Sequence, residues 1–243
     1  MDLPAAVEKD MKLIQGKGTG SNSIEVEVIS VVSFLKAFKI NSPVVFDVGA
    51  NKGLYTEAFL RLMPNAEVFA FEPSLSAIKE FQIRFSGHSN VHLIPIALGK
   101  QNSVLSLYSD KSGSGLASLT KRRVQHFGIE MNYVESISCR KLDDWIIERN
   151  VYPDFIKIDV EGHELDVLSG AISVLSKVRV IQFEFGGCNI DTRTFFQDFW
   201  YFFTVQNYSI YRITPTGVTP ILSYSEEDEY FSTTNYLAIK QTT

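Results

Sequence analysis

Residues 47–53, which read Asp-Val-Gly-Ala-Asn-Lys-Gly, constrain the fold more than any other stretch of this chain. They follow the apolar residues 44–46 and precede residues 54–60, where apolar side chains recur at helical spacing. This order predicts a strand, a tight turn and a helix. The two glycines let the backbone adopt conformations that side chains forbid. In an open α/β sheet, ligands bind outside the carboxyl ends of the strands, so the turn is predicted to face the binding crevice.

Two acidic residues near this turn favour a nucleoside ligand that carries positive charge. The phosphate-binding pattern G-x-G-x-x-G is absent, because Asn51 replaces its second glycine and Gly53 comes one residue early. Asp47 ends the first predicted strand and suits positive charges such as the sulfonium and amino group of S-adenosylmethionine. Glu72 ends the second predicted strand and is placed to accept hydrogen bonds from two ribose hydroxyls. A helix cap at Asp47 and a solvated turn at Glu72 are the alternatives.

Composition restricts the class of protein. With 243 residues, of which 45% are hydrophobic, the chain suits one α/β domain over residues 1–243. A net charge of −5 gives no electrostatic footprint for nucleic acid. Cys139 and Cys188 are too few for a disulfide framework and lack metal-ligand spacing, so reduced thiols are expected. Because neither a signal peptide nor a membrane span is recognisable, a cytoplasmic protein without a membrane partner is expected.

The periodicity of the remaining chain predicts a seven-stranded sheet, mostly parallel, with one antiparallel edge hairpin and helices on both faces. Residues 1–40 are expected to form a helical segment before the first strand. Helices are also expected at 75–85, at 142–149 and after Gly162, the last with a buried stripe of Leu165, Leu168, Ile172 and Leu175. The strands are expected at 44–46, 67–71, 91–98, 155–160, 178–185, 208–213 and 235–240, with the last two paired through a turn near 215–217.

An insertion at residues 101–140 interrupts the alternation of strands and helices. Its expected strands, 103–108 and 133–139, flank a polar loop, where a common cofactor fold acquires its own acceptor specificity. The loop contains a glycine-rich stretch with Ser114, assigned here to the acceptor, and an isolated basic run. In that run Arg122 and Arg123 are candidates to grip an anionic acceptor such as a nucleotide-linked sugar. A plain surface loop with solubilising charges is the alternative.

Five motifs resemble, in order, those of the FkbM-type S-adenosylmethionine-dependent methyltransferases. They read Asp47-Val-Gly-Ala-Asn-Lys-Gly-Leu-Tyr-Thr, Phe71-Glu-Pro, Ala97-Leu-Gly, Leu142-Asp-Asp-Trp and Ile156-Lys-Ile-Asp-Val-Glu-Gly-His-Glu. The resemblance implies a Rossmann-like methyltransferase that acts on a hydroxyl group, often of a sugar or a polyketide. We assign cofactor binding to the following positions within these motifs: Asp47, Gly49, Ala50, Asn51, Gly53, Tyr55, Thr56, Glu72, Pro73, Ala97 and Asp159.

Candidate general bases gather directly after the fourth predicted strand. If the strand persists to Glu161, its period of two points Asp159 and Glu161 toward the crevice. His163 would then lie in the first helical turn, and its ordinary pKa of about 6.5 suits proton abstraction near neutrality. We therefore assign Asp159, Glu161 and His163 to catalysis, with a backbone-bonded His163 as the alternative. Lys157 is expected to pair with Asp159 inside the strand.

Two further roles follow from the acidic residues. Asp159, Glu161 and Glu184 are oxygen ligands that could hold Mg²⁺. The adjacent Asp-Asp or Asp-Asn pair that is usual after the fifth strand in such metal sites is missing, because the chain reads Glu184-Phe185-Gly186. Metal-independent catalysis is therefore favoured, and no metal ligand is assigned. Glu184 is assigned to the small-molecule acceptor. A nicotinamide-dependent oxidoreductase and a catalytically silent nucleoside-binding module are the alternative functions.

Aromatic residues after residue 194 form two stripes at helical spacing. Phe195, Phe199 and Phe202 form one of them, and the other consists of Phe196, Trp200 and Phe203. Two aromatic faces exceed what one core contact needs. Burial against the sheet, contact with a second subunit in a homodimer and contact with the acceptor are the three uses considered for the second face.

Overall fold

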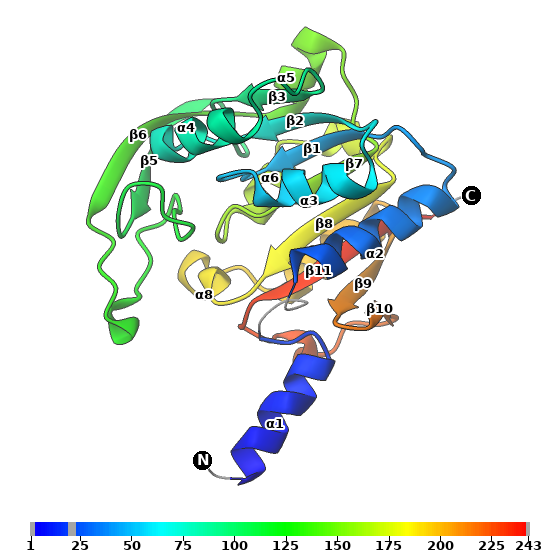
Figure 1. Ribbon diagram of the computed structural model, residues 1–243. Coiled ribbons are helices and arrows are strands. Elements are labelled where there is room, and N and C mark those ends of the chain that lie inside the picture. Colours follow the sequence, from blue (N-terminus) through cyan, green and yellow to red (C-terminus); the bar gives the residue numbers. More distant parts are fainter. Residues whose placement is uncertain (1–2, 19–22, 242–243) are drawn as a thin grey trace.

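The computed structural model describes residues 3–18 and 23–241, and a mixed sheet forms its centre (Figure 1). The strand order is β10-β9-β11-β8-β7-β1-β2-β3. Strands β8, β7, β1, β2 and β3 run parallel, whereas β11 is antiparallel to both of its neighbours. The strands are β1 (Val44–Val48), β2 (Glu67–Phe71), β3 (Val91–Ile94), β7 (Phe155–Ile158), β8 (Val180–Phe185), β9 (Tyr208–Thr214), β10 (Gly217–Ile221) and β11 (Thr234–Lys240).

The mainly parallel α/β sheet confirms the predicted fold class, but the sheet has eight strands instead of seven. Strand β9 pairs with β11 as expected, with Tyr211 opposite Leu237. The turn at residues 215–217 leads instead into β10, an additional antiparallel edge strand. The sequence conceals β10 because Pro220 lies inside it, and proline is tolerated in strands chiefly at a sheet edge.

The insertion forms a second, smaller sheet beside the carboxyl ends of the central strands (Figure 1). The predicted hairpin is confirmed, with Leu107 opposite Glu135. The third predicted strand, 91–98, is wrong in its extent, because β3 ends at Ile94 and Pro95 has no N–H to continue the ladder. The smaller sheet has the order β4-β6-β5 and consists of β4 (Ala97–Leu98), β5 (Ser103–Ser109) and β6 (Tyr133–Arg140).

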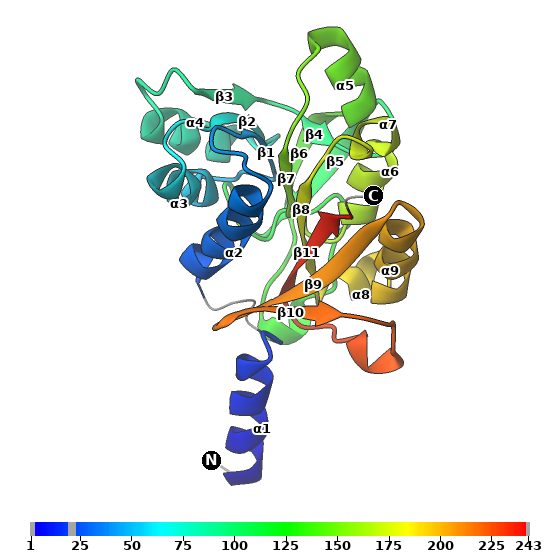
Figure 2. The same cartoon turned by 90° about the vertical axis from the view of Figure 1, so that its right-hand side faces the viewer.

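Helices cover both faces of the central sheet (Figure 2). One face packs against α2 (Ile24–Ala37), α3 (Leu54–Leu62) and α4 (Leu75–Arg84). The opposite face packs against α5 (Leu142–Arg149), α6 (Glu164–Ser169), α7 (Ile172–Leu175) and α9 (Phe196–Val205). The remaining elements are α1 (Leu3–Ile14), which extends away from the body, the short α8 (Cys188–Thr192), and the 3₁₀ turns η1 (Gln125–Phe127) and η2 (Glu226–Asp228).

Two predicted helical stripes differ from the structure. The helix expected after Gly162 is divided into α6 and α7 at Gly170, where a Cβ atom would lie only 2.1 Å from the backbone oxygen of Gly99. The helix is interrupted at this close backbone contact, so the predicted stripe is not continuous. Ile172, which was predicted to be buried in it, is 51% exposed.

In α9 the buried stripe combines members of both predicted faces. It consists of Phe196, Phe199 and Phe203, whereas Phe195 is exposed. Phe199 stacks on Phe183 of β8 with ring centroids 4.9 Å apart. Burial against the sheet therefore accounts for most of these aromatic rings, and the homodimer stays a prediction.

Both cysteines, Cys139 and Cys188, are buried and free of disulfide bonds. None of the helices in residues 3–18 and 23–241 has the length and apolar character that crossing a membrane requires.

Candidate functional site

The turn after β1 brings two backbone segments into close contact. Gly49 has a φ of +80°, and a Cβ atom on it would lie 1.8 Å from the carbonyl oxygen of Asp159. The N–H groups of Gly49 and Ala50 both donate to the carbonyl oxygen of Phe71, at 3.0 and 3.1 Å. Only glycine therefore allows the ends of β1, β2 and β7 to converge here.

Glu72 is held in a fixed orientation at the end of β2. Its carboxylate accepts hydrogen bonds from the backbone N–H groups of Ser74 and Asn51, both at 2.8 Å. The side chain is buried, and burial raises the pKa of Glu72 to about 7 against the opposing effect of these two bonds. Each carboxylate oxygen keeps a lone pair for a further donor.

A first cavity lies at the carboxyl ends of β1 and β2, beneath the insertion. Its lining combines residues predicted from the sequence with apolar side chains that were not predicted, among them Phe71, Leu98 and Leu107. The predicted residues that line it are Gly49, Asn51, Glu72, Pro73, Ala97, Ser114, Asp159 and Glu161.

Alternating charges cross the sheet beside this cavity. The ammonium group of Lys157 lies 3.5 Å from Asp47 and 3.3 Å from Asp159. Burial alone would lower the pKa of Lys157, but the carboxylates of Asp159 and Asp47 raise it above its usual value. Asp47 also accepts a 2.6 Å hydrogen bond from Thr56 and is 1% exposed. This placement favours a structural role for Asp47 over the expected contact with a cofactor.

The chain after β7 is a turn rather than a continuing strand, so the side chains of Asp159 and Glu161 are not aligned by a strand period. Glu161 has a φ of +55°, and the buried Glu164 side chain accepts the N–H groups of Val160 and Gly162 at 3.0 and 3.1 Å. Burial and the nearby Asp159 carboxylate raise the pKa of Glu161, against the lowering effect of an arginine.

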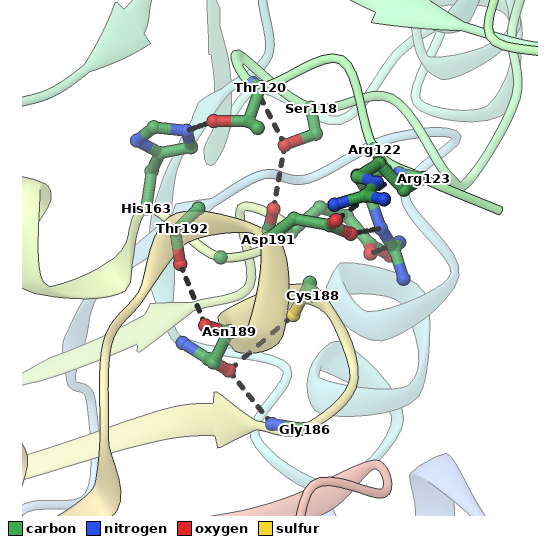
Figure 3. Close-up of polar contacts among 12 residues, drawn as sticks. Ser118, Thr120, Arg122, Arg123, His163, Gly186, Cys188, Asn189, Asp191 and Thr192 are labelled. Atoms are coloured by element: carbon green, nitrogen blue, oxygen red, sulfur yellow. Dashed lines mark hydrogen bonds and ion pairs between the residues drawn. The ribbon is translucent and has the colours of Figure 1, made fainter.

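That arginine belongs to the insertion, which is fastened to this turn at three points (Figure 3). The Ser118 hydroxyl donates to the Glu161 carbonyl oxygen at 2.7 Å, and the Arg122 guanidinium donates to the Glu161 carboxylate at 2.5 Å. The Thr120 hydroxyl and His163 Nε2 are 2.9 Å apart. The insertion therefore forms one wall of the cavity and holds the turn that carries Asp159.

Short helix α8 adds a fourth contact to this arrangement. Asn189 accepts the N–H of Gly186 at 2.8 Å and so fixes α8 at the end of β8. Asp191 then accepts the backbone N–H of Arg123 at 3.2 Å and lies 3.9 Å from the Arg122 guanidinium. Arg122 is thereby neutralised within the protein, which favours a structural role over the expected grip on an anionic acceptor.

His163 does not line the first cavity. It occupies the N-cap position of α6, and its Nδ1 atom lies 2.8 Å from the Asp166 carboxylate. Its Nε2 atom faces the Thr120 hydroxyl (Figure 3). Both ring nitrogens have protein partners. This arrangement therefore favours a role for His163 in holding the insertion against the turn over a role as the general base. Its predicted alternative, a bond to the backbone, is replaced by these two side-chain bonds.

A second cavity adjoins the first on the face covered by α2 and α3. Both cavities share Gly49, Asn51 and Asp159. Ala50, Tyr55 and Glu184 also line the second cavity, whereas Asp47, Gly53, Thr56, Arg122, Arg123 and His163 line neither. Burial and the nearby Asp159 carboxylate raise the pKa of Glu184 well above its usual value.

Sequence reasoning missed the polar network behind this second cavity. Glu27 accepts hydrogen bonds from Gln182 at 2.7 Å and Asn235 at 3.0 Å, and Gln182 accepts the hydroxyl of Tyr55 at 2.6 Å. One local signal existed, since Gln182 interrupts the apolar run of β8. In the described part of the chain, no three acidic, histidine or cysteine side chains are grouped as metal ligands would be.

A family model, two relatives and a solved structure that are similar to this chain are all described as methyltransferases. The family model "Methyltransferase FkbM domain" matches residues 47–210. The 2-O-methyltransferase NoeI of Sinorhizobium fredii is 28% identical over 180 residues, which cover 70% of this chain and 71% of that protein. Methyltransferase 1 of Beauveria bassiana is 25% identical over 168 residues, which cover 60% of this chain and 68% of that protein. The crystal structure of a methyltransferase FkbM from Methylobacillus flagellatus superposes with a TM-score of 0.52 at 19% identity, covering 81% of this chain and 44% of that one.

Proposed function

Because the chain belongs to the FkbM methyltransferase family and is an S-adenosylmethionine-dependent methyltransferase, we propose that it methylates a hydroxyl group of a sugar-like small molecule. The observation that carries this proposal is the position of Asp159, which lines both cavities. The similarity to a protein described as a 2-O-methyltransferase supports oxygen as the methylated atom. The family membership disfavours the oxidoreductase alternative.

The first cavity fits the nucleoside part of the cofactor. The carboxylate of Glu72 is oriented by two backbone N–H groups and is suited to two ribose hydroxyls. The absent side chain at Gly49 leaves the backbone open to a close approach, and the apolar Leu98 and Leu107 offer surfaces for the adenine ring. When bound, the cofactor supplies a methyl group activated by its sulfonium.

The residues around Asp159 would orient the acceptor and remove its proton. Asp159 is 38% exposed at the boundary of the two cavities, so its carboxylate can accept the proton of a hydroxyl placed in the second cavity. Lys157 holds Asp159 in place from within the sheet at 3.3 Å. The alignment of two reactants supplies roughly 7–11 kcal/mol of barrier reduction in favourable cases, and a positioned base adds a factor of about 10² to 10⁴.

The proposal is tested by transfer of a labelled methyl group from S-adenosylmethionine to a panel of mono- and oligosaccharides. We expect at least one saccharide to gain an O-linked methyl group, located by mass spectrometry and NMR. Labelling that occurs only on amines, nucleic acid or protein in a parallel panel would contradict the proposal while leaving the methyltransferase assignment intact.

Glu72 provides a pH-dependent check of the cofactor site. Since burial raises its pKa to about 7, the carboxylate is mostly ionised at pH 8 and mostly protonated at pH 6. The ionised form accepts both ribose hydroxyls, so the affinity for S-adenosylhomocysteine should fall about tenfold from pH 8 to pH 6. Calorimetry measures this change directly.

The variant Glu72→Ala should lower the affinity at pH 8 by tenfold or more, because each hydrogen bond to a charged acceptor contributes roughly 1.5–3 kcal/mol. It should also remove the pH dependence. Glu67→Ala, at the exposed start of the same strand, is the control and should resemble the parent protein. Parent-like binding by Glu72→Ala would assign the ribose to another residue.

A further inference from the structure

The second cavity has fixed polar walls that come from three separate parts of the chain. Glu27 lies on α2, Glu184 on β8 and Asn235 on β11, and all three line the cavity together with Asp159. The bonds from Gln182 and Asn235 hold the Glu27 carboxylate in one orientation. Gln182 is 1% exposed and Asn235 is 8% exposed, so this scaffold is largely shielded from solvent. A cavity with preformed carboxylate and amide groups suits a ligand that offers several hydroxyl donors.

The charged groups around this cavity are two carboxylates, those of Glu27 and Asp159, and two ammonium groups, those of Lys52 and Lys157. Glu184 adds a third carboxyl group, whose raised pKa disfavours its charged form. Both ammonium groups already have acidic partners. Lys157 lies between Asp47 and Asp159, and Lys52 lies 2.9 Å from Glu80 outside the cavity.

An anionic ligand would therefore meet unfavourable charges in this cavity. A phosphate or carboxylate placed here would lose hydration and gain no unpaired cation among the described lining residues. A neutral polyol avoids this cost, and a protonated amine is attracted by the carboxylates.

Two of these wall residues lie outside the segment that the family shares. The family model covers residues 47–210, whereas Glu27 precedes this segment and Asn235 follows it. Features common to the family, such as the turn after β1, face the first cavity as well as the second. The position of Glu27 and Asn235 is that of residues that distinguish one member's acceptor from another's.

We propose that the second cavity is the acceptor site, and that it takes a neutral sugar or an amino sugar instead of a phosphate- or nucleotide-linked one. This inference rests on the proposed function and adds the charge class of the acceptor and the residues that select it. Glu27 and Asp159 set the charge preference, Glu184 adds a polar carboxyl group to the wall, and Asn235 and Tyr55 keep the walls in place.

The test compares matched probes that differ in charge. Methyl glycosides of glucose, galactose and mannose serve as neutral probes, the corresponding 2-amino sugars as cations, and the 1-phosphates as anions. Saturation-transfer NMR measures the binding of each probe to the protein with and without S-adenosylhomocysteine. We expect neutral and amino probes to bind at least tenfold more tightly than the 1-phosphates of the same sugars.

Variants assign this preference to the cavity. Glu27→Gln keeps the shape of the side chain and removes its charge, so it should weaken amino-sugar binding at least fivefold relative to neutral probes. It should also reduce the difference in affinity between the neutral probes and the 1-phosphates. Glu25→Gln is the matched control, because Glu25 lies on the same helix, is 66% exposed in its side chain and does not line the cavity.

Three outcomes would overturn the proposal. They are tighter binding of the 1-phosphates, no binding by any of the three classes, and a Glu27→Gln protein that behaves like Glu25→Gln. A separate calorimetric titration with S-adenosylhomocysteine distinguishes a failure of the cofactor assignment from a failure of the acceptor-site proposal. Failure of that titration contradicts the cofactor assignment, whereas the ranking of the sugar probes tests the acceptor site by itself.

Discussion

Replacing Asp159 by asparagine is expected to lower kcat by a factor of about 10² to 10⁴, the typical contribution of a positioned general base. The amide keeps the size of the side chain but cannot accept a proton at neutral pH. Lys157 retains its second partner, Asp47, at 3.5 Å, so the fold around the turn should persist. Steady-state kinetics, together with calorimetry of S-adenosylhomocysteine, separates a loss of chemistry from a loss of cofactor binding.

His163 supplies the comparison for this experiment. Its ring is bonded to Thr120 and Asp166, so His163→Ala should reduce kcat far less than Asp159→Asn does. Thr120→Val, which removes the same bond from the insertion, should reproduce the His163→Ala effect. If His163→Ala is as damaging as Asp159→Asn while Thr120→Val is silent, the base is His163. Activity of Asp159→Asn within about threefold of the parent would clear Asp159 of this role.

Replacing Gly49 by alanine should destabilise the fold by about 2–5 kcal/mol and abolish cofactor binding. The left-handed backbone conformation contributes about 1–2 kcal/mol of this loss, and forced overpacking contributes about 1–3 kcal/mol. The packing loss follows from the Cβ position, 1.8 Å from the backbone oxygen of Asp159, which has no flexible end that could move aside. Denaturant unfolding followed by circular dichroism measures the change in free energy.

Gly87→Ala separates the two contributions. Gly87 has a similar φ of +91°, but a Cβ atom there would meet nothing within 4 Å. Its substitution should cost only the conformational part, about 1–2 kcal/mol. Equal destabilisation by Gly49→Ala and Gly87→Ala would show that the close contact between Gly49 and the backbone of Asp159 tolerates a side chain.

Residues whose placement depends on neighbours along the chain could be predicted from the sequence. Gly49, Glu72 and Asp159 each follow a short apolar strand, and parallel strands bring their carboxyl ends to one edge of the sheet. This rule needs only the order of strands and helices. It cannot tell whether a strand ends at its last apolar residue, which is why the alignment expected for Asp159 and Glu161 failed.

Residues whose role depends on distant partners could not be predicted in the same way. Glu27 meets Gln182 across 155 residues and Asn235 across 208 residues. Nothing in the local sequence of α2 shows that Glu27 faces a cavity instead of solvent. Similarly, the sequence suggested Arg122 as an anion-binding residue and His163 as a general base. Their actual partners depend on the packing of the insertion against the turn after β7, which the sequence does not show.

The additional strand β10 has a consequence for how copies of this protein meet. An edge strand normally presents free N–H and C=O groups that can recruit a strand from another molecule and start aggregation. In β10 the exposed Pro220 has no N–H to offer, and at the opposite edge β3 is only four residues long. Both borders of the sheet therefore discourage cross-molecular strand pairing, and self-association is expected to use helical surfaces instead.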